Sequence, residues 1–381
     1  MTEKLYYIDA YIKEFSANVI SCKKEGEYYE VILDRTAFFP EEGGQYSDRG
    51  FLGDVRVFDV KEKNGIIYHY TEGELEVAKE VLGRIDFDER YEKMQCHSGE
   101  HILSGIIHTL FGLDNVGFHL GKDDVTMDVS APLTRAQLDE VERLANEVIY
   151  KNIEIKAEFP TPAELSGMEY RSKLDLTENV RIVTVGEYDA CACCAPHVKY
   201  TGEIGVIKIL DFAKLRGGVR LYITAGRRAL RTFREYYENT QSVSALLSVP
   251  KNEISAGVEK LLNEYTSLKN SHSAYRISVM EKDAEKIEKT RDNLVLLYPD
   301  ATTEELIAFS NKAVSKIGGM LVLLSGKEGN FKYVISSQNF DLKEKIFDIN
   351  KSLLGRGGGK PNMVQGSFLT DYGNIKKYFN P

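Results

Sequence analysis

Two short segments of the chain hold side chains that could bind one metal ion. His97 and His101 lie four residues apart, and Cys193 and His197 repeat that spacing about a hundred residues later. Residues four apart share one face of a helix, so the imidazoles of the first pair can reach the same atom. Neutral imidazole and thiolate are the ligands that zinc prefers, usually four in a tetrahedron. The two pairs together therefore predict a zinc centre.

The composition of the whole chain indicates the class of protein and the cellular compartment in which such a centre would occur. The 381 residues suggest two to four domains, and 43% hydrophobic with 28% charged residues is ordinary for a globular protein. No apolar run approaches the length of a membrane span, and residues 1–15 lack a signal-peptide pattern. Five cysteines, three of them clustered, suit metal binding in a reducing compartment better than a disulfide framework. We therefore expect a cytoplasmic protein.

Charge is distributed unevenly along the chain. The net charge of -9 argues at first against a nucleic-acid partner. Between Lys199 and Arg234, however, nine Lys or Arg are opposed only by Glu203 and Asp211. A stripe of this kind can follow a phosphate backbone on an acidic protein, although a solvated helix face would show the same pattern.

The N-terminal region has the periodicity of strands. Residues 1–88 contain runs in which apolar and polar residues alternate, and Asn64-Gly65 separates two of them as a hairpin turn would. Between the runs lie Gly43 and Gly44, which permit a sharp turn or a close approach of the backbone to a ligand. An ordinary turn is the plainer interpretation of this glycine pair.

The period becomes helical from about residue 88. The predicted helix over 91–111 carries the first histidine pair. Thr134 and Gln137 have the spacing of a capping box, which predicts another helix start. Strands are predicted at 182–185 and 204–210, and the second metal pair lies between them, where Pro196 favours a turn.

The last third of the chain predicts a long helix and then a small α/β domain. Apolar residues spaced alternately four and three form a heptad seam, which predicts an antiparallel helical hairpin or a coiled coil. They are Ile254, Val258, Leu261, Tyr265, Leu268, Tyr275 and Val279, and His272 is a polar interruption of the seam and not a ligand. Strands at 294–297 and 320–324 flank a helix at 302–317. The segment 355–361 combines four glycines with Arg356 and Lys360, which predicts a flexible cationic loop for phosphate or sugar, or else a plain surface loop.

In this order, the motifs resemble those of the free-standing alanyl-tRNA editing proteins, the AlaX family, and of the editing part of alanyl-tRNA synthetase. Residues 36–45 resemble the family's glycine-rich motif, and residues 94–103 its first zinc motif. Residues 193–205 resemble its second zinc motif, although Cys194-Ala195-Pro196 stands where the synthetase type has Gly-Gly-Thr. The segment 356–365 resembles the C-terminal domain of the synthetase. The resemblance covers nearly the whole chain and points to the long subtype.

The resemblance implies an α+β multidomain fold with four parts. They are an N-terminal β-barrel with the glycine-rich motif (1–88), a zinc-containing editing domain shared with threonyl-tRNA synthetase (89–235), a helical coiled-coil connector (236–290) and a small C-terminal α/β domain (291–381). The last part is expected to help bind tRNA and to form a homodimer.

The resemblance also implies a zinc-dependent aminoacyl-tRNA deacylase that hydrolyses mischarged seryl-tRNA(Ala), with glycyl-tRNA(Ala) as a further substrate. One zinc per chain is expected on His97, His101, Cys193 and His197. We expect the first three to be firm ligands and His197 to be replaceable by water or by the substrate's amino group. Zinc would then mainly position the serine moiety, and Cys191 is an alternative to Cys193 as the thiolate ligand.

Two residues are candidates for the catalytic step itself. The hydroxyl of Thr36 could contact the serine hydroxyl, because a pocket that hydrogen-bonds a hydroxyl rejects the analogue that lacks it. A strand threonine without a role is the other interpretation. Glu100 is a weaker candidate for a general base, since it points off the ligand face of the helix. The candidate tRNA contacts are Gly43, Gly44, Gln45, Arg216, Arg227, Arg228, Arg356 and Lys360.

Two other functions fit parts of the sequence. Residues 97–101 match the H-x-x-E-H signature of metalloproteases, in which Glu100 would be the base, but Cys193 and His197 are the wrong third-ligand chemistry. A tRNA-binding protein with a purely structural zinc fits if all four ligands close the site. A full synthetase is set aside, because too little chain precedes the first zinc motif to hold an aminoacylation domain.

Overall fold

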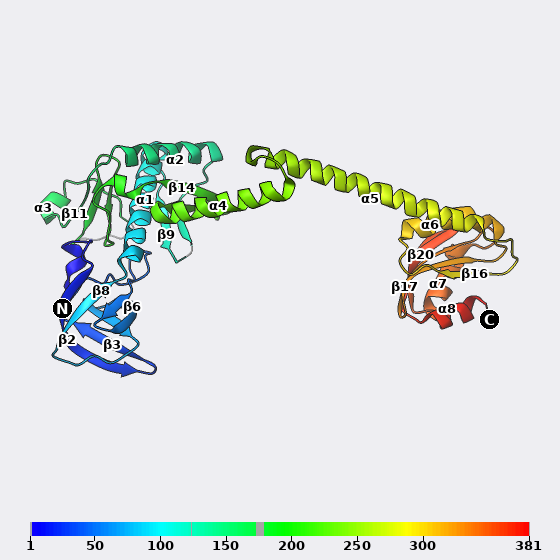
Figure 1. Cartoon of the computed structure of the whole chain (residues 1–381), viewed down its shortest axis with the longest axis horizontal. Coiled ribbons are helices and arrows are strands. Elements are labelled where there is room, and N and C mark those ends of the chain that lie inside the picture. The colour runs from blue at the N-terminus through cyan, green and yellow to red at the C-terminus, as the bar shows by residue number, and fades with distance from the viewer. Residues whose placement is uncertain (1, 123, 173–178, 381) are drawn as a thin grey trace. The chain divides into compact units, whose positions relative to one another are not determined.

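The computed structural model describes residues 2–122, 124–172 and 179–380, and its contacts divide the chain into two compact units, Met1–Thr240 and Gln241–Pro381. Both units mix helices with sheets, as the predicted α+β class requires (Figure 1). None of the helices in the described ranges is long and apolar enough to cross a membrane.

The first unit begins with a ring of six antiparallel strands that closes into a barrel. In barrel order the strands are β2 (Glu14–Glu25), β3 (Tyr28–Leu33), β7 (Ile66–Thr71), β6 (Val55–Lys63), β5 (Gly50–Leu52) and β8 (Glu80–Ile85). The first half of β2 alternates between exposed and buried residues, which points Phe15, Ala17 and Val19 into the core. The predicted hairpin at Asn64-Gly65 is confirmed: both residues have positive φ and join β6 to β7.

A two-stranded parallel sheet joins the start of the chain to the strand that precedes the glycine pair. Strand β1 (Glu3–Lys4) pairs in parallel with β4 (Arg35–Thr36), and a 3₁₀ turn, η1, covers Leu5–Tyr7. After β4 the chain enters residues 42–48, which we call the glycine-rich loop. Gly43 and Gly44 have φ of 62° and 79°, and a Cβ on Gly44 would lie 2.3 Å from the carbonyl oxygen of Phe118. The loop therefore lies directly against the strand that holds Phe118, with no room for a side chain.

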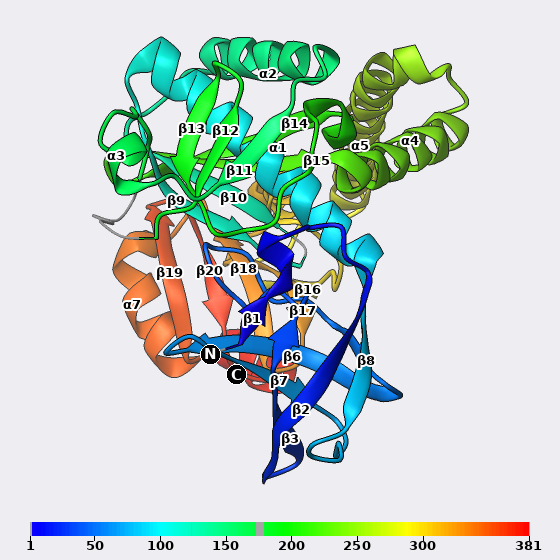
Figure 2. The same ribbon diagram turned by 90° about the vertical axis from the view of Figure 1, so that its left-hand side faces the viewer.

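Helix α1 (Phe87–Phe111) leads from the barrel into the rest of the unit (Figure 2). Acidic residues in its first turn favour a helix start, and it ends at Gly112, whose φ of 64° is left-handed. Every residue from Lys93 to Ile107 is buried, so protein surrounds the helix on all sides. The predicted helix over 91–111 is thus confirmed and begins a turn earlier.

Two sheets and further helices surround α1. One sheet has the order β14 (Ile207–Leu215), β15 (Gly218–Ala225), β10 (Val125–Val129), β9 (Asn115–Leu120), and the other has β11 (Ile155–Glu158), β12 (Ile182–Val185), β13 (Asp189–Ala192). The helices are α2 (Arg135–Tyr150), α3 (Pro162–Leu165) and α4 (Gly226–Leu247), which runs across the boundary of the units. Both halves of the predicted Thr134–Gln137 capping box form. The predicted strand at 204–210 is partly wrong: Thr201–Ile204 is a 3₁₀ turn, η2, and β14 starts at Ile207.

The second unit consists of one long helix and a five-stranded sheet with three shorter helices. After a 3₁₀ turn, η3 (Lys251–Glu253), helix α5 spans Ile254–Glu285. The sheet has the order β16 (Leu294–Leu297), β17 (Leu321–Lys327), β18 (Asn330–Ser336), β20 (Met363–Phe368), β19 (Gly355–Lys360). The helices are α6 (Thr303–Ala313), continued by the 3₁₀ turn η4 (Val314–Lys316), α7 (Leu342–Ser352) and α8 (Tyr372–Phe379).

The glycine-rich segment 355–361 and the heptad seam both differ in part from the sequence-based prediction. The segment predicted as a flexible cationic loop is instead strand β19, paired along its length with β20. Glycine suits that pairing, because a Cβ on Gly357 would lie 2.4 Å from the Tyr333 hydroxyl oxygen. The heptad seam lies on α5 as predicted, but its side chains face solvent: Tyr265, Leu268 and Tyr275 are 63–69% exposed.

Candidate metal centre

The structure brings the two predicted metal pairs together. His97 and His101 come from the buried middle of α1, and Cys193 and His197 from the turn that follows β13. One ligand atom from each of the four residues lies within 4.8 Å of the others. The Cys193 Sγ lies 3.6 Å from His97 Nε2 and 3.3 Å from His197 Nε2. Four soft or borderline ligands at this spacing can hold one metal ion of the zinc type.

Each of the three imidazoles has a partner at its other nitrogen. The Nδ1 of His97 lies 3.0 Å from Gln45 Oε1, that of His101 lies 2.9 Å from Asp189 Oδ2, and that of His197 lies 2.9 Å from Ser98 Oγ. A proton on Nδ1 can be donated to each of these oxygens, which leaves the Nε2 lone pair directed at the centre. Metal-binding histidines are usually held in this way.

The turn that carries Cys193 and His197 is fastened by one arginine. The buried Arg181 donates from one terminal nitrogen to the carbonyl of Cys193 at 2.9 Å and to that of Ala195 at 2.8 Å. The turn that Pro196 predicted is confirmed, since residues 193–199 are neither helix nor strand. Arg181 therefore fixes the backbone between Cys193 and His197 at two carbonyls, those of Cys193 and Ala195.

The electrostatics of the cluster favour a thiolate at Cys193 and a neutral ring at His197. Burial by itself lowers the pKa of His101, but Asp189 and Cys193 outweigh it and raise that pKa well above its usual value. Burial by itself raises the pKa of the Cys193 thiol, but the imidazoles of His97 and His197 outweigh it and hold the pKa well below its usual range. Burial lowers the pKa of His197 to about 3, so that ring is neutral near pH 7. Cys191 differs: burial raises its pKa to about 11, and it groups with His101 and Asp189 instead of with the four. The thiolate of the four-residue cluster is therefore Cys193.

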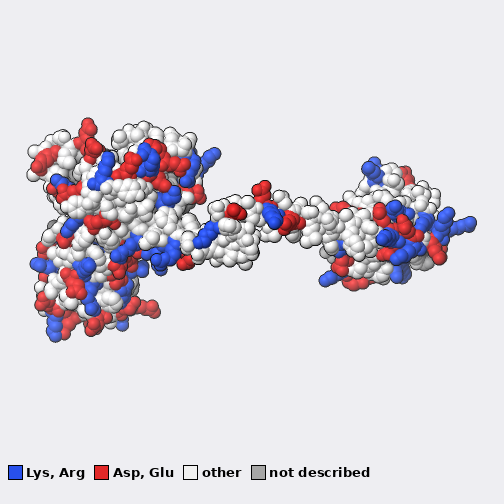
Figure 3. All heavy atoms as spheres, turned by 45° about the horizontal axis from the view of Figure 1, so that its top comes forward, with Lys and Arg blue, Asp and Glu red and all other residues white. Residues whose placement is uncertain are grey.

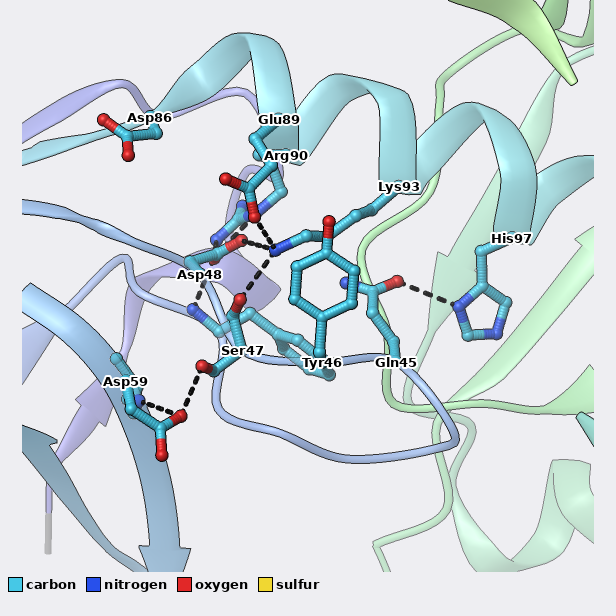
Figure 4. A network of polar contacts seen from close by, with 12 residues as sticks. Gln45, Tyr46, Ser47, Asp48, Asp59, Asp86, Glu89, Arg90, Lys93 and His97 are labelled. Atoms are coloured by element: carbon cyan, nitrogen blue, oxygen red, sulfur yellow. Dashed lines mark hydrogen bonds and ion pairs between the residues drawn. The ribbon is translucent and has the colours of Figure 1, made fainter. Parts of the chain in front are cut away.

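The glycine-rich loop forms one wall of the centre. Figure 4 shows Gln45 reaching from this loop to His97, with its amide oxygen on the imidazole. The ring of His97 also lies 4.8 Å from that of Phe118, against which Gly44 is packed. On the other side, a Cβ on Gly43 would lie 3.3 Å from Cys194 Sγ. Gly43 and Gly44 thus allow the loop to approach the metal ligands closely enough for Gln45 to touch one.

The two predicted catalytic residues are both buried. Thr36 is 0% exposed, its Oγ1 lies 2.8 Å from His69 Nε2, and it accepts from the Phe38 N–H at 3.1 Å. The Nδ1 of His69 faces the Val31 carbonyl at 3.1 Å, so Nε2 accepts and the Thr36 hydroxyl donates. One acceptor position remains on the Thr36 oxygen.

Glu100 lies between the two histidines of α1 in the sequence and is not one of the four residues whose ligand atoms converge. Its Oε1 accepts from Asn115 Nδ2 at 2.5 Å and from the Ser104 hydroxyl. Burial by itself raises the pKa of Glu100, but the nearby imidazoles and the Ser104 hydroxyl lower it below its usual range. Glu100 is therefore an ionised acceptor in the wall of the site.

Two family models match parts of the chain. The model described as "Threonyl and Alanyl tRNA synthetase second additional domain" matches residues 180–222, the stretch that holds Cys193 and His197. The model described as "tRNA synthetases class II (A)" matches residues 3–89, which include the barrel and the glycine-rich loop.

Individual relatives match along almost the whole chain. Alanyl-tRNA editing protein AlaX-L of Pyrococcus horikoshii is 29% identical over 96% of this chain and 94% of its own length. This chain is AlaX-L-like. Alanyl-tRNA editing protein Aarsd1-A of Xenopus laevis is 28% identical over 94% of the chain and 92% of that protein. An alanine–tRNA ligase of Archaeoglobus fulgidus is 31% identical over 96% of the chain, but the match spans only 42% of the ligase.

The solved structures that match include the C-Ala domain of Aquifex aeolicus alanyl-tRNA synthetase. The match covers 23% of this chain and 86% of that domain at 21% identity. Its TM-score of 0.21 is too low to assign a fold.

The basic residues predicted to contact tRNA differ widely in exposure in this AlaX-L-like chain. Arg227 pairs with Asp88 at 2.6 Å, and the buried Arg228 donates to the Gly121 carbonyl at 2.8 Å and to the Tyr46 hydroxyl oxygen at 3.1 Å. Arg216 lies exposed at the turn from β14 to β15, and Arg356 and Lys360 are exposed on β19. Figure 3 shows Lys and Arg interspersed with Asp and Glu on the face it presents.

Sequence reasoning missed the residues that hold the ligands in place. Asp189, Ser98 and Arg181 were not singled out, and Gln45 was expected to touch tRNA and not a histidine. The available signals were weak: Ser98 lies within the first zinc motif, and Asp189 lies four residues before Cys193. Neither position specifies a contact with a particular imidazole without the fold.

Proposed function

We propose that this AlaX-L-like chain is a trans-editing hydrolase that deacylates mischarged seryl-tRNA(Ala), with glycyl-tRNA(Ala) as a further substrate. One observation supports this above the others. His97, His101, Cys193 and His197 converge within 4.8 Å in a chain that is similar over 96% of its length to an alanyl-tRNA editing protein. The resident metal would be one zinc per chain.

The chemistry divides between the metal and the side chains around it. Zinc held by His97, His101 and Cys193 would supply a positive charge that orients the substrate's amino group or a water and polarises the ester carbonyl. His197 would be the ligand that water or the substrate displaces, because catalytic zinc sites keep one exchangeable position. Gln45, Asp189 and Ser98 keep the imidazoles in the tautomer that leaves Nε2 free.

The deciding experiment is ester hydrolysis with a matched thiol control. The zinc-loaded protein is incubated with seryl-tRNA(Ala) and alanyl-tRNA(Ala), and the remaining ester is followed together with bound zinc. We expect selective loss of the seryl ester, abolished with the zinc in Cys193→Ala but kept in Cys22→Ala, whose thiol lies in the barrel wall. Hydrolysis of neither ester, with zinc and tRNA still bound, would instead identify a tRNA-binding protein with a structural zinc.

We propose Glu100 as the acceptor of the proton from the attacking water. The carboxylate is buried beside both histidines, and Asn115 and Ser104 hold its orientation. Glu100→Gln keeps the side-chain shape, and loss of a general base should lower kcat by about 100-fold or more with zinc content unchanged. An unaltered kcat would leave Glu100 as a structural acceptor only. Cleavage of casein that Glu100→Gln abolishes would support the metalloprotease reading instead.

For tRNA binding we propose the exposed basic residues and the glycine-rich loop. Arg216, Arg356 and Lys360 have the exposure that phosphate contact requires. Gly43 and Gly44 would let the loop backbone approach the acceptor end, with Gln45 behind it. Arg228 supports Tyr46 of the loop, so we expect it to contribute through the loop more than through phosphate. Arg227 pairs with Asp88 of α1, which partly neutralises its charge.

We further propose that the chain is organised in four domains, with boundaries after residues 88, 235 and 290. We also propose that it forms a homodimer through its second unit. Leu261, Tyr265 and Leu268 are 54–69% exposed along the heptad seam of α5, and a seam of this kind is buried in helical pairs. Leu268→Glu should shift the protein to monomer in sedimentation velocity. Asn263→Glu, on the opposite face of α5, should not. If the wild-type protein sediments as a monomer at high concentration, the homodimer proposal is wrong.

A further inference from the structure

A buried cluster of charges lies beneath the glycine-rich loop, and its cations lie about one and two helical turns before His97 on α1. Asp48 at the end of the loop is 1% exposed and accepts from the Arg90 Nε at 2.8 Å and from the Phe39 N–H at 2.7 Å. The ammonium group of Lys93 lies 3.6 Å from the other oxygen of Asp48 and 3.0 Å from Glu89. We call Asp48, Arg90 and Lys93 the latch. Figure 4 shows both cations coming from α1 and meeting the loop.

The latch holds the backbone of the loop as well as its carboxylate. Lys93 donates to the Ser47 carbonyl at 2.6 Å, and its ammonium group lies 3.8 Å from the centre of the Tyr46 ring. Arg90 donates to the carbonyl of Ala37 at 2.7 Å, in the segment that leads into the loop, and to that of Ala10 at 3.1 Å, in the segment before β2. The chain is therefore tied to α1 at Ala37, before the loop, and at Ser47 and Asp48, after Gln45.

The two cations of the latch and the candidate metal ligand His97 lie on the same helix, α1. Arg90, Lys93 and His97 follow each other at spacings of three and four, so they lie along one face of α1. Gln45 lies three residues before Asp48 and places its Oε1 3.0 Å from His97 Nδ1. Among the described residues the Nε2 of Gln45 has no hydrogen-bond partner, although it is buried. The position of its own backbone therefore decides whether Gln45 reaches His97. The latch holds that backbone after Gln45, and the Leu120 N–H holds it before Gln45 by donating to the Gly44 carbonyl at 2.7 Å.

We propose that Asp48, Arg90 and Lys93 are positioning residues that fix the glycine-rich loop on α1 and thereby hold Gln45 on His97, keeping that imidazole in the orientation that binds the metal. This proposal rests on the zinc site of the proposed function and not on the identity of its substrate.

The composition of the latch argues for positioning over stability. Buried ion networks are often no more stabilising than apolar residues of the same shape, because desolvation of the charges offsets their attraction. A fixed fork from Arg90 to one carboxylate and two carbonyls, however, allows a single loop position. Sub-ångström placement is what a partner of a metal-bound histidine requires.

A double-mutant cycle on zinc affinity tests the proposal. Zinc dissociation constants are measured by competition with a chromophoric chelator for the wild type, Gln45→Met, Asp48→Asn and the double variant. Loss of a partner to a metal-bound histidine typically weakens binding by about 10–100-fold. We expect both single variants to weaken zinc binding to that extent, and the double variant to be no weaker than Gln45→Met alone within about threefold, because the latch acts through Gln45.

Two results would overturn the proposal: fold-losses that multiply in the double variant, or unchanged zinc affinity in either single variant. Glu142→Gln is the matched control, since that carboxylate also accepts from a cation, Lys208, and a backbone N–H, that of Ile209, but lies on α2. If Asp48→Asn does not fold, Lys93→Met replaces it in the same cycle with the same two outcomes. Zinc affinity is read without tRNA, so absence of seryl-tRNA hydrolysis would leave this result intact.

Discussion

The carboxylate of Asp189 accepts a hydrogen bond from Nδ1 of His101 at 2.9 Å, although 88 residues separate them. Its other oxygen accepts from Arg171 Nε at 2.8 Å, and the carboxylate is almost completely buried. Asp189 therefore joins a candidate metal ligand of α1 to strand β13, which leads into the second candidate pair. A carboxylate behind a metal-bound imidazole fixes the ring and increases its basicity.

Replacing this carboxylate should weaken the metal site without removing a ligand. We expect Asp189→Asn to raise the zinc dissociation constant by about 10–100-fold, because the amide holds the Nδ1 proton less strongly. Chelator competition measures it. Asp114→Asn is the control, since Asp114 makes the same contact to His108 at 3.0 Å on the exposed end of α1. If Asp189→Asn and the wild type bind zinc with equal affinity, the role of Asp189 is confined to its ion pair with Arg171.

Thr36→Val should affect both selectivity and stability. We expect the ratio of seryl to alanyl ester hydrolysis to narrow, because the pocket loses the hydroxyl proposed to recognise serine. We also expect the free energy of unfolding to fall by about 1–3 kcal/mol, since the Phe38 N–H and His69 Nε2 lose their partner. Thr36→Ser should restore both quantities. A folded Thr36→Val with an unchanged ratio would confine Thr36 to a structural role.

The buried His69 should make the barrel sensitive to acid. Burial lowers the pKa of His69 to about 4, against an ordinary value of 6.5. Between these two pH values the unfolded chain binds a proton that the folded chain does not, so stability falls as the pH drops through this window. The limiting slope is about 1.4 kcal/mol per pH unit.

Urea unfolding at pH 7 and pH 4.5 measures this effect at saturating zinc. The decrease in the free energy of unfolding should be smaller in His69→Gln, which cannot take up the proton. The comparison isolates His69 because the metal ligands are the same in both proteins. The same decrease in both would show that His69 does not carry this pH dependence.

Neutralising the basic residues of β19 should change the salt dependence of tRNA binding. Each phosphate contact that is lost lowers the slope of log affinity against log salt by about 0.7–0.9. We expect Arg356→Gln and Lys360→Gln each to reduce the slope by about this amount, measured by fluorescence anisotropy of labelled tRNA(Ala). Lys286→Gln, which removes an exposed cation paired with Asp283, should leave the slope unchanged.

Local signals in the sequence predicted much of the fold. The helix around His97 and His101, the hairpin at Asn64-Gly65 and the capping box at Thr134 all form as expected. Each depends on side-chain periodicity or on the backbone preferences of a few adjacent residues. Strand β19 was not predicted, because a run of glycines has no periodicity of its own and is placed by the strand beside it.

The sequence alone determined the donor set of the candidate metal centre, because residue type and a spacing of four restrict which chemistry is available. The tertiary structure decided everything that depends on contacts between distant segments. It placed Gln45, Asp189 and Ser98 on the Nδ1 atoms of the three histidines, and it selected Cys193 over Cys191. Local propensities do not encode such contacts, because they arise only when the barrel, α1 and the sheet strands pack together and fix atoms from separate elements within hydrogen-bonding distance.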